Sequence, residues 1–121
     1  MTKILIVDDD KSATTLLSKI MLLEGYESAI VNESTKAVEV AAEVKPDLFL
    51  LDLMMPDING FELCRILRSD VRFSNTPVVI VSAMDDAVSK TAAFSAGAND
   101  YVTKPFFPDD LLGRIKALIK K

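Results

Sequence analysis

Short apolar runs alternate with helical apolar spacings along the whole chain of 121 residues. Five runs predict β-strands, at residues 3–7, 27–31, 48–51, 78–81 and 100–102. Several of these runs are almost continuously apolar, as is typical of strands that are buried on both faces of a parallel sheet. The pattern therefore indicates a parallel sheet whose two faces are covered by helices.

Apolar residues spaced by three and four predict a helix after each strand. We expect their inward stripes at Leu16, Ile20 and Leu23, at Ala37, Val40, Ala41 and Val44, at Phe61, Cys64 and Leu67, at Val88, Ala92 and Ala96, and at Leu111, Leu112, Ile115, Leu118 and Ile119. Asp10 is predicted to cap the first helix and Ser34 the second. Five strand-then-helix units predict one α/β domain over residues 1–121, with a doubly wound sheet of five parallel strands and five helices.

Polar residues stand where the predicted strands end. Asp8 and Asp9 follow the first strand, Asp52 the third, Ser82 the fourth and Lys104 the fifth. The carboxyl ends of parallel strands meet at one edge of a sheet, which is where such folds bind ligands. We therefore expect carboxylates, a hydroxyl and an ammonium group to lie together there.

The composition narrows the chemistry. The chain has no histidine, which excludes Ser-His-Asp catalysis and zinc sites built on histidine. Its net charge is −4 and it has no basic tract, so no direct nucleic-acid contact is expected. The single cysteine, Cys64, permits no internal disulfide and is predicted to be a small buried apolar residue. The chain shows neither a signal-peptide pattern nor an apolar run that could cross a bilayer, so a cytoplasmic location without membrane contact is expected.

The polar cluster suits phosphoryl chemistry. Hard oxygen ligands without histidine or cysteine favour Mg²⁺, which binds carboxylates, water and phosphate oxygens. A carboxylate beside such an ion can act as a nucleophile and form an acyl phosphate. Lys104 and Ser82 would then hold the phosphoryl oxygens, since catalysis of this kind is mainly positioning and charge neutralisation.

These motifs, taken in order, resemble the response-regulator receiver family of two-component signalling, including its chemotaxis receivers. The resemblance rests on the apolar strand that ends in Asp8-Asp9, on Asp52 followed by Met55-Pro56 and Asn59-Gly60, on Ser82-Ala83, and on Lys104-Pro105-Phe106. It covers essentially all of the chain and implies a flavodoxin-like strand order of 2-1-3-4-5.

The resemblance also implies a role for each matching residue. Asp52 would accept the phosphoryl group, and Asp9, Asp52 and the backbone carbonyl of Met54 would bind Mg²⁺. Asp8 would act on the ion mostly through a bound water, and Lys104 would pair with the phosphoryl group. The protein would be a switch that assists its own phosphorylation and dephosphorylation, rather than an enzyme acting on a separate substrate.

Phosphorylation would change the shape of one surface of the domain, and this surface would transmit the signal. Ser82 would move to contact the phosphoryl group, Tyr101 would turn inward, and the peptide bond from Lys104 to Pro105 would be cis. The donor would be a sensor histidine kinase or a histidine phosphotransfer protein. Members of the family often pair or signal through their fourth helix, fifth strand and fifth helix.

In this chain that surface would contain Phe94, Lys90, Tyr101 and Arg114. Phe94 is predicted to lie on the side of the fourth helix opposite the inward stripe. We therefore expect a homodimer or an output partner to bind around Phe94, although an incidental exposed aromatic residue is the alternative.

Two other functions fit part of the pattern. A phosphatase of the haloacid-dehalogenase type would use Asp8 as its nucleophile, with Ser82 and Lys104 in later positions. That interpretation leaves Asp52 unexplained and lacks a further acidic motif after Lys104. A pure binding module, such as a flavodoxin or a receiver that has lost phosphorylation, would need a phosphate loop after the first strand or a missing site residue, and the sequence shows neither.

Overall fold

A central parallel sheet organises the computed structural model, which describes residues 1–119. Its strand order is β2-β1-β3-β4-β5. The strands are β1 (Lys3–Val7), β2 (Glu27–Val31), β3 (Leu48–Leu51), β4 (Val78–Ser82) and β5 (Asp100–Thr103). The predicted strands and the order implied by the resemblance are confirmed, and β4 and β5 each extend one residue further than predicted.

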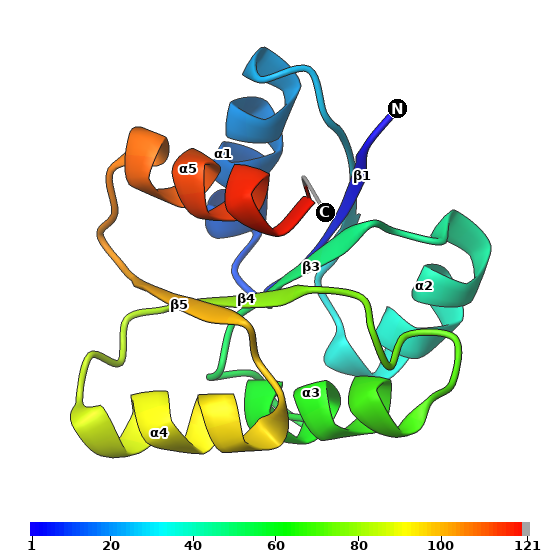
Figure 1. The fold of residues 1–121 in the computed structure, drawn as a ribbon, viewed down its shortest axis with the longest axis vertical. Coiled ribbons are helices and arrows are strands. Elements are labelled where there is room, and N and C mark those ends of the chain that lie inside the picture. The colour runs from blue at the N-terminus through cyan, green and yellow to red at the C-terminus, as the bar shows by residue number, and fades with distance from the viewer. Residues whose placement is uncertain (120–121) are drawn as a thin grey trace.

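Helices cover both faces of the sheet. Within residues 1–119 they are α1 (Lys11–Leu23), a short 3-10 helix η1 (Ser34–Lys36), α2 (Ala37–Val44), α3 (Gly60–Ser69), α4 (Ala87–Ala96) and α5 (Pro108–Ile119). In Figure 1, α1 and α5 lie on one face and α2, α3 and α4 on the other, which is the doubly wound arrangement that the pattern predicted. Among these helices, none has both the length and the apolar character required to cross a membrane.

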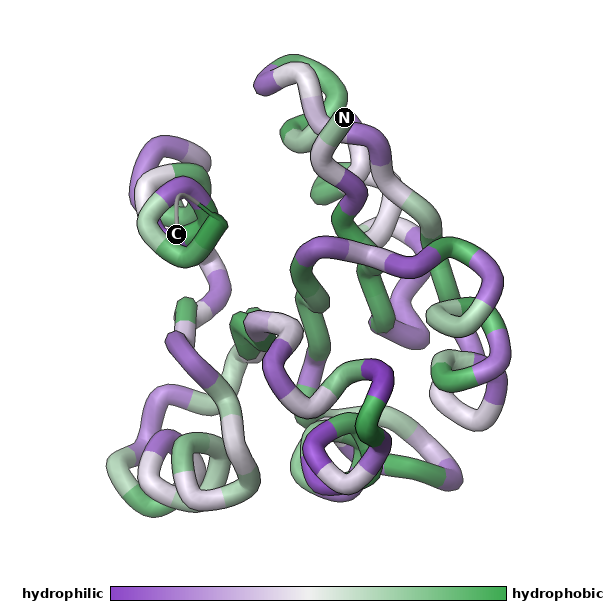
Figure 2. The backbone as a smooth tube through the Cα atoms, turned by 45° about the vertical axis from the view of Figure 1, so that its right-hand side comes forward, coloured by the Kyte–Doolittle hydropathy of each residue, from purple (hydrophilic) through white to green (hydrophobic). Residues whose placement is uncertain are grey.

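The core forms two layers because successive residues of a strand point to opposite faces. Leu5 and Val7 of β1 pack with α2, α3 and α4, whereas Ile4 and Ile6 pack with α1 and α5. All four are at most 1% exposed. Burying each such side chain contributes about 1.5–3 kcal/mol. Figure 2 shows hydrophobic colour along the strands and mixed colour around the helices, as this layering requires.

The inward face of α1 differs from the prediction. Ile20 is buried as expected, but Leu16 and Leu23 are 54% and 88% exposed, and the buried stripe is completed by Leu17 and Met21. Leu16 and Leu17 are adjacent in this helix, so the sequence fits two overlapping apolar stripes. In the structure, the stripe with Leu17 packs against the sheet and the one with Leu16 does not.

The stripe predicted for α4 is also displaced by one residue. Val88 is 79% exposed, while Ser89 and Ala93 are buried together with Ala96. Ser89 can be buried because its hydroxyl donates to the carboxylate of Asp86, which caps this helix. Ser89, whose hydroxyl has a local hydrogen-bond partner, is therefore buried, although hydrophobicity alone predicts that Val88 would be.

Ser34 is not the cap of α2. It begins η1, is 5% exposed, and directs its hydroxyl to the loop after β3. Asp10 does cap α1, since its carboxylate accepts from the amides of Ser12 and Ala13.

The predicted stripes of α3 and α5 are largely confirmed. Cys64 and Leu67 are fully buried, and Phe61 packs against the same cluster while partly exposed. Leu111 and Ile115 are fully buried on the other face of the sheet. Cys64 is thus the small buried residue that the sequence predicted, and its burial raises the pKa of the thiol.

Candidate functional site

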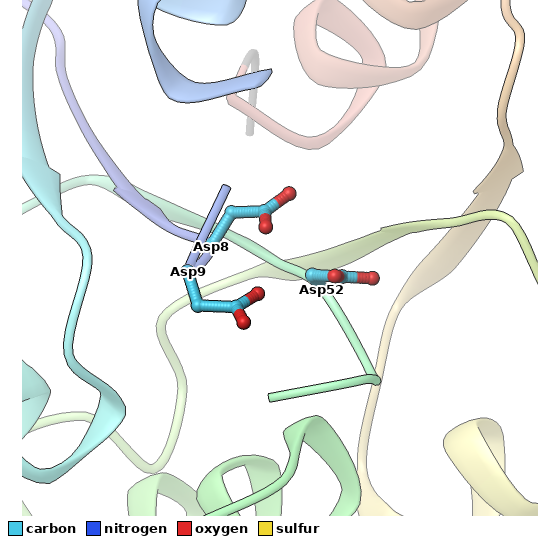
Figure 3. Close-up of side chains that lie close together, drawn as sticks. All are labelled: Asp8, Asp9 and Asp52. Atoms are coloured by element: carbon cyan, nitrogen blue, oxygen red, sulfur yellow. The ribbon is translucent and has the colours of Figure 1, made fainter. Parts of the chain in front are cut away.

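Two neighbouring strands bring the three carboxylates together. Val7 of β1 pairs with Leu51 of β3, so the residues that follow them, Asp8 and Asp52, are adjacent at the edge of the sheet. The amide of Asp52 donates to the carbonyl of Val7 at 3.0 Å. Carboxylate oxygens of Asp8, Asp9 and Asp52 all lie within 4.8 Å of one another, and Figure 3 shows the three side chains close together.

Because two of the three carboxylates are buried, holding negative charge in this cluster costs free energy. Asp8 is 2% and Asp52 8% exposed, whereas Asp9 faces solvent. Burial, followed by the nearby charge of Asp8, raises the pKa of Asp52. The charge of Lys104 and the backbone amides of Leu53 and Met54 act against that increase. The cluster therefore favours a cation or a partner that brings positive charge.

Lys104 provides the positive charge inside the site. Its Nζ donates to Asp8 Oδ2 at 2.7 Å, and its amide donates to the Ser82 carbonyl at 2.8 Å. The Lys104–Pro105 peptide bond is cis. In this structure the ammonium group is thus bonded to Asp8, and it influences Asp52 through its charge.

The loop after β3 wraps around the Asp52 carboxylate. The Leu53 amide donates to Asp52 Oδ1 at 2.8 Å, and the Gly60 amide donates to the Leu53 carbonyl at 3.0 Å. Met54 is 64% exposed, and its backbone hydrogen-bonds to the Asp52 carboxylate. A Cβ atom on Gly60 would lie 2.2 Å from the Asp52 carbonyl oxygen, so only glycine permits this close approach.

Ser82 and Tyr101 meet at the same short segment. Ser82 is fully buried, and its Oγ accepts from the Met84 amide at 3.3 Å. The hydroxyl of Tyr101 donates to the Met84 carbonyl. Tyr101 is 7% exposed, so its ring already points inward, and this burial raises the pKa of its phenol.

Sequence reasoning missed a further contributor, Asn32, which follows β2. Its Nδ2 donates to the Asp8 carbonyl at 2.8 Å and to Thr14 Oγ1 at 3.1 Å. Asn32 thereby joins the end of β2 to the acidic segment and to α1. The available signal was a polar residue directly after a strand that neighbours β1, the same signal that identified Asp52.

The donor set fits Mg²⁺. It consists of carboxylate oxygens without nitrogen or sulfur ligands, two of its members belong to buried residues, and their spacing suits a single small ion. Asp8, Asp9 and Asp52 would supply side-chain oxygens. Receivers of this kind generally bind Mg²⁺, and the cluster agrees with that property.

Phe94, Lys90 and Arg114 lie on the face formed by α4, β5 and α5 as expected, whereas Tyr101 is buried beneath it. Phe94 is 47% exposed, and Arg114 bonds to Asp100 at 2.8 Å and to Asp110 at 3.1 Å. Lys90 lies over the ring of Tyr101, 5.8 Å from its centre. Since Tyr101 is buried, it supports this face from below.

Comparison with known proteins agrees with the geometry. Residues 4–116 match the family model of the response regulator receiver domain. The chain is 40% identical over 119 residues to the DNA-binding response regulator MtrA of Mycolicibacterium paratuberculosis, covering 98% of this chain and 52% of that protein. It is 37% identical over 121 residues to the DNA-binding dual master transcriptional regulator RpaA of Synechocystis, covering 100% of this chain and 50% of that protein. The chain thus spans about half the length of these curated relatives.

Solved structures show the same fold. The BeF3-activated N-terminal receiver domain of Klebsiella pneumoniae RstA superposes with a TM-score of 0.93 at 32% identity, covering 99% of this chain and 100% of that one. The chemotaxis protein CheY4 of Vibrio cholerae superposes with a TM-score of 0.92 at 27% identity, covering 98% of each chain.

These matches leave the dehalogenase-type phosphatase without support. In this chain the acidic pair follows β1, Asp52 follows β3 and Lys104 follows β5. The chain therefore belongs to the response regulator receiver domain family and is a phosphorylation-dependent switch of two-component signalling.

Proposed function

We propose that Asp52 accepts the phosphoryl group from a phosphohistidine of a sensor kinase or phosphotransfer protein. A carboxylate oxygen of Asp52 forms the new O–P bond while the N–P bond of the donor breaks. The donor histidine takes a proton from solvent on its second ring nitrogen and leaves as neutral imidazole. The observation that carries this proposal is the convergence of Asp8, Asp9 and Asp52 within 4.8 Å at the carboxyl edge of the sheet.

The neighbouring groups favour the ionised nucleophile. The charge of Lys104 and the backbone amides of Leu53 and Met54 oppose the increase in the pKa of Asp52. Mg²⁺, which Asp9, Asp52 and the Met54 carbonyl would hold directly and Asp8 through water, would supply charge neutralisation for the phosphoryl oxygens. Asp8 is bonded to Lys104, which is consistent with contact to the ion through water. The same groups would assist hydrolysis of the acyl phosphate, so that the domain promotes both phosphorylation and dephosphorylation of itself.

A labelling experiment tests this assignment. The protein incubated with acetyl phosphate and Mg²⁺ is expected to gain one phosphoryl group, and borohydride reduction followed by peptide mapping should place it on Asp52. Chelation of Mg²⁺ should suppress the reaction. Label found on Asp8 would instead restore the phosphatase-type chemistry and remove Asp52 from the central role.

The signal is proposed to travel through the Met84 peptide. Ser82 Oγ accepts from the Met84 amide, and Tyr101 donates to the Met84 carbonyl. If Ser82 turns to bind a phosphoryl oxygen, it leaves the Met84 amide, and the segment between β4 and α4 is free to shift. Lys104 is proposed to move from Asp8 to the phosphoryl group in the same step.

The surface proposed to bind a partner after phosphorylation is the face of α4, β5 and α5 around Phe94. We expect wild type to form dimers in the presence of beryllofluoride and Mg²⁺, and Phe94→Ala to form them about tenfold more weakly or worse. Tenfold corresponds to about 1.4 kcal/mol, and truncating a residue at the centre of an interface can cost about 2 kcal/mol or more. Val71→Ala is the matched control, because Val71 is 88% exposed and lies outside this face.

Analytical ultracentrifugation over a range of concentrations measures the association. A wild-type protein that stays monomeric with beryllofluoride would exclude self-association through this face and leave a separate partner to be tested.

The output proposed for a protein carrying this domain is control of DNA binding. The curated relatives are named as DNA-binding regulators and are about twice as long as the matched region. The net charge of −4 argues that the nucleic-acid contact is made by a different segment and not by this domain.

A further inference from the structure

The loop between β3 and α3 contains a tight turn at Asp57. Asp57 has φ +68°, and the Ile58 amide donates to the Pro56 carbonyl at 2.8 Å. A hydrogen bond between residues i and i+2 around a positive φ is the mark of a γ-turn of the rarer, strained kind. Such a conformation persists in a residue with a side chain only when its surroundings hold it.

Ser34 provides that support from a distant part of the chain. Its hydroxyl donates to the Pro56 carbonyl at 3.0 Å and accepts from the Ile58 amide at 3.3 Å. One buried side chain, 5% exposed, thus bonds to both ends of the turn. Because water has little access to Ser34, removal of the hydroxyl would leave the Pro56 carbonyl without this donor.

The turn lies in the same loop as the backbone that faces Asp52. The loop begins with the Leu53 amide bonded to Asp52 Oδ1, continues through Met54, and returns at the Gly60 amide, which bonds to the Leu53 carbonyl. With these two points fixed, the turn at Asp57 is one of the constraints on the path of the chain between them. We expect a change at Asp57 to reach the Met54 peptide, which lies three residues before it in the same closed loop.

We propose that Ser34 is a positioning residue for the cation site, and that its hydroxyl keeps the Met54 backbone in place beside Asp52. This inference rests on the proposed function, in which the Met54 carbonyl is a ligand of Mg²⁺. Ser34 itself contacts neither the ion nor the phosphoryl group. It acts by fixing the turn at Pro56 to Ile58, one step further from the ion than a group that bonds to a ligand directly.

The test is a Mg²⁺ titration of the unphosphorylated protein, followed by amide NMR shifts. Ser34→Ala is expected to weaken Mg²⁺ binding by about three- to tenfold, below the roughly 10–100-fold effect of removing a group bonded directly to a ligand, because Ser34 acts through the turn. The Ile58 amide should also exchange with solvent faster than in wild type. Ser34→Thr keeps the hydroxyl and is expected to bind Mg²⁺ with an affinity closer to wild type than to Ser34→Ala.

Ser28→Ala is the matched control. Ser28 lies in β2, and its hydroxyl is 2.8 Å from that of Ser18, so this variant loses one partly buried hydrogen bond outside the site. Its Mg²⁺ affinity should equal that of wild type even if its stability falls.

Two results would overturn the role of Ser34 while leaving the proposed function intact. One is a wild-type affinity for Mg²⁺ in Ser34→Ala, and the other is equal weakening in Ser34→Ala and Ser34→Thr. A wild-type protein that binds no Mg²⁺ would overturn the proposed function and the role of Ser34 together, and the wild-type titration alone reveals that case.

Discussion

Asp52→Asn is expected to abolish phosphorylation and, at the same time, to make the metal-free protein more stable. The amide cannot form the acyl phosphate, so no label should appear at this position. Burial and the charge of Asp8 both oppose the ionised form of Asp52 in the fold. Removing that charge should raise the free energy of unfolding by about 1–2 kcal/mol. This is less than the several kcal/mol that burial of an unpaired ion costs, because Lys104 and two backbone amides already stabilise the Asp52 carboxylate.

The gain in stability should depend on pH with a definite sign. The pKa of Asp52 is raised in the folded protein. Between its ordinary value and this raised value the folded state binds more protons than the unfolded state, so the contribution of Asp52 to stability falls as pH rises. The advantage of Asp52→Asn is therefore full above the raised pKa and disappears as pH drops into the ordinary carboxylate range.

Urea unfolding of both proteins between acid and neutral pH measures this difference. Asp109→Asn makes the same change in net charge at an exposed position in the first turn of α5, where a carboxylate favours the helix dipole, so it should lose a little stability. Mg²⁺ should stabilise wild type more than Asp52→Asn. Equal stability of wild type and Asp52→Asn at neutral pH without metal would contradict the account of a strained carboxylate cluster.

The central strands β1, β3 and β4 were predictable because burial on both faces leaves a nearly continuous apolar signal. Helix faces were harder, since α1 contains adjacent leucines and α4 contains small residues all around, and both allow more than one stripe. Arg68 shows a second limit. Its guanidinium donates to the carbonyls of Gly97, Phe73 and Thr76, and also to Asn99. No local pattern identifies an arginine whose partners are backbone carbonyls up to 29 residues away and a side-chain amide 31 residues away.

The acidic cluster was predictable because parallel strands end at one edge and each strand end carried a polar residue. Its supporting groups were not. Asn32 and Ser34 act through hydrogen bonds to the backbone of other segments, and such bonds leave no spacing in the sequence. The inward position of Tyr101 likewise depends on the Met84 carbonyl, which only the fold brings within reach.

Gly60→Ala is expected to cause the largest loss of stability among single substitutions at the site. A Cβ at this position would lie 2.2 Å from the carbonyl oxygen of Asp52 and 2.7 Å from the Cα of Leu53. Both atoms belong to the backbone at the end of β3, which cannot rotate away as a long side chain can. Because overpacking against fixed atoms commonly costs 1–3 kcal/mol and this contact is closer than most, we expect a loss of about 3 kcal/mol or more.

Gly113→Ala is the control for this substitution. Gly113 lies within α5 with nothing within 4 Å of the added Cβ, so alanine should stabilise the helix by about 0.5–1 kcal/mol. Urea unfolding should therefore move in opposite directions for the two glycines. The acetyl phosphate reaction distinguishes local from global damage, because the clash falls on Asp52 itself: the fraction of Gly60→Ala that remains folded should be labelled more slowly than wild type, and Gly113→Ala at the wild-type rate. A Gly60→Ala protein within about 0.5 kcal/mol of wild type, as for an ordinary surface substitution, would mean that the loop after β3 yields and does not hold Asp52 in place.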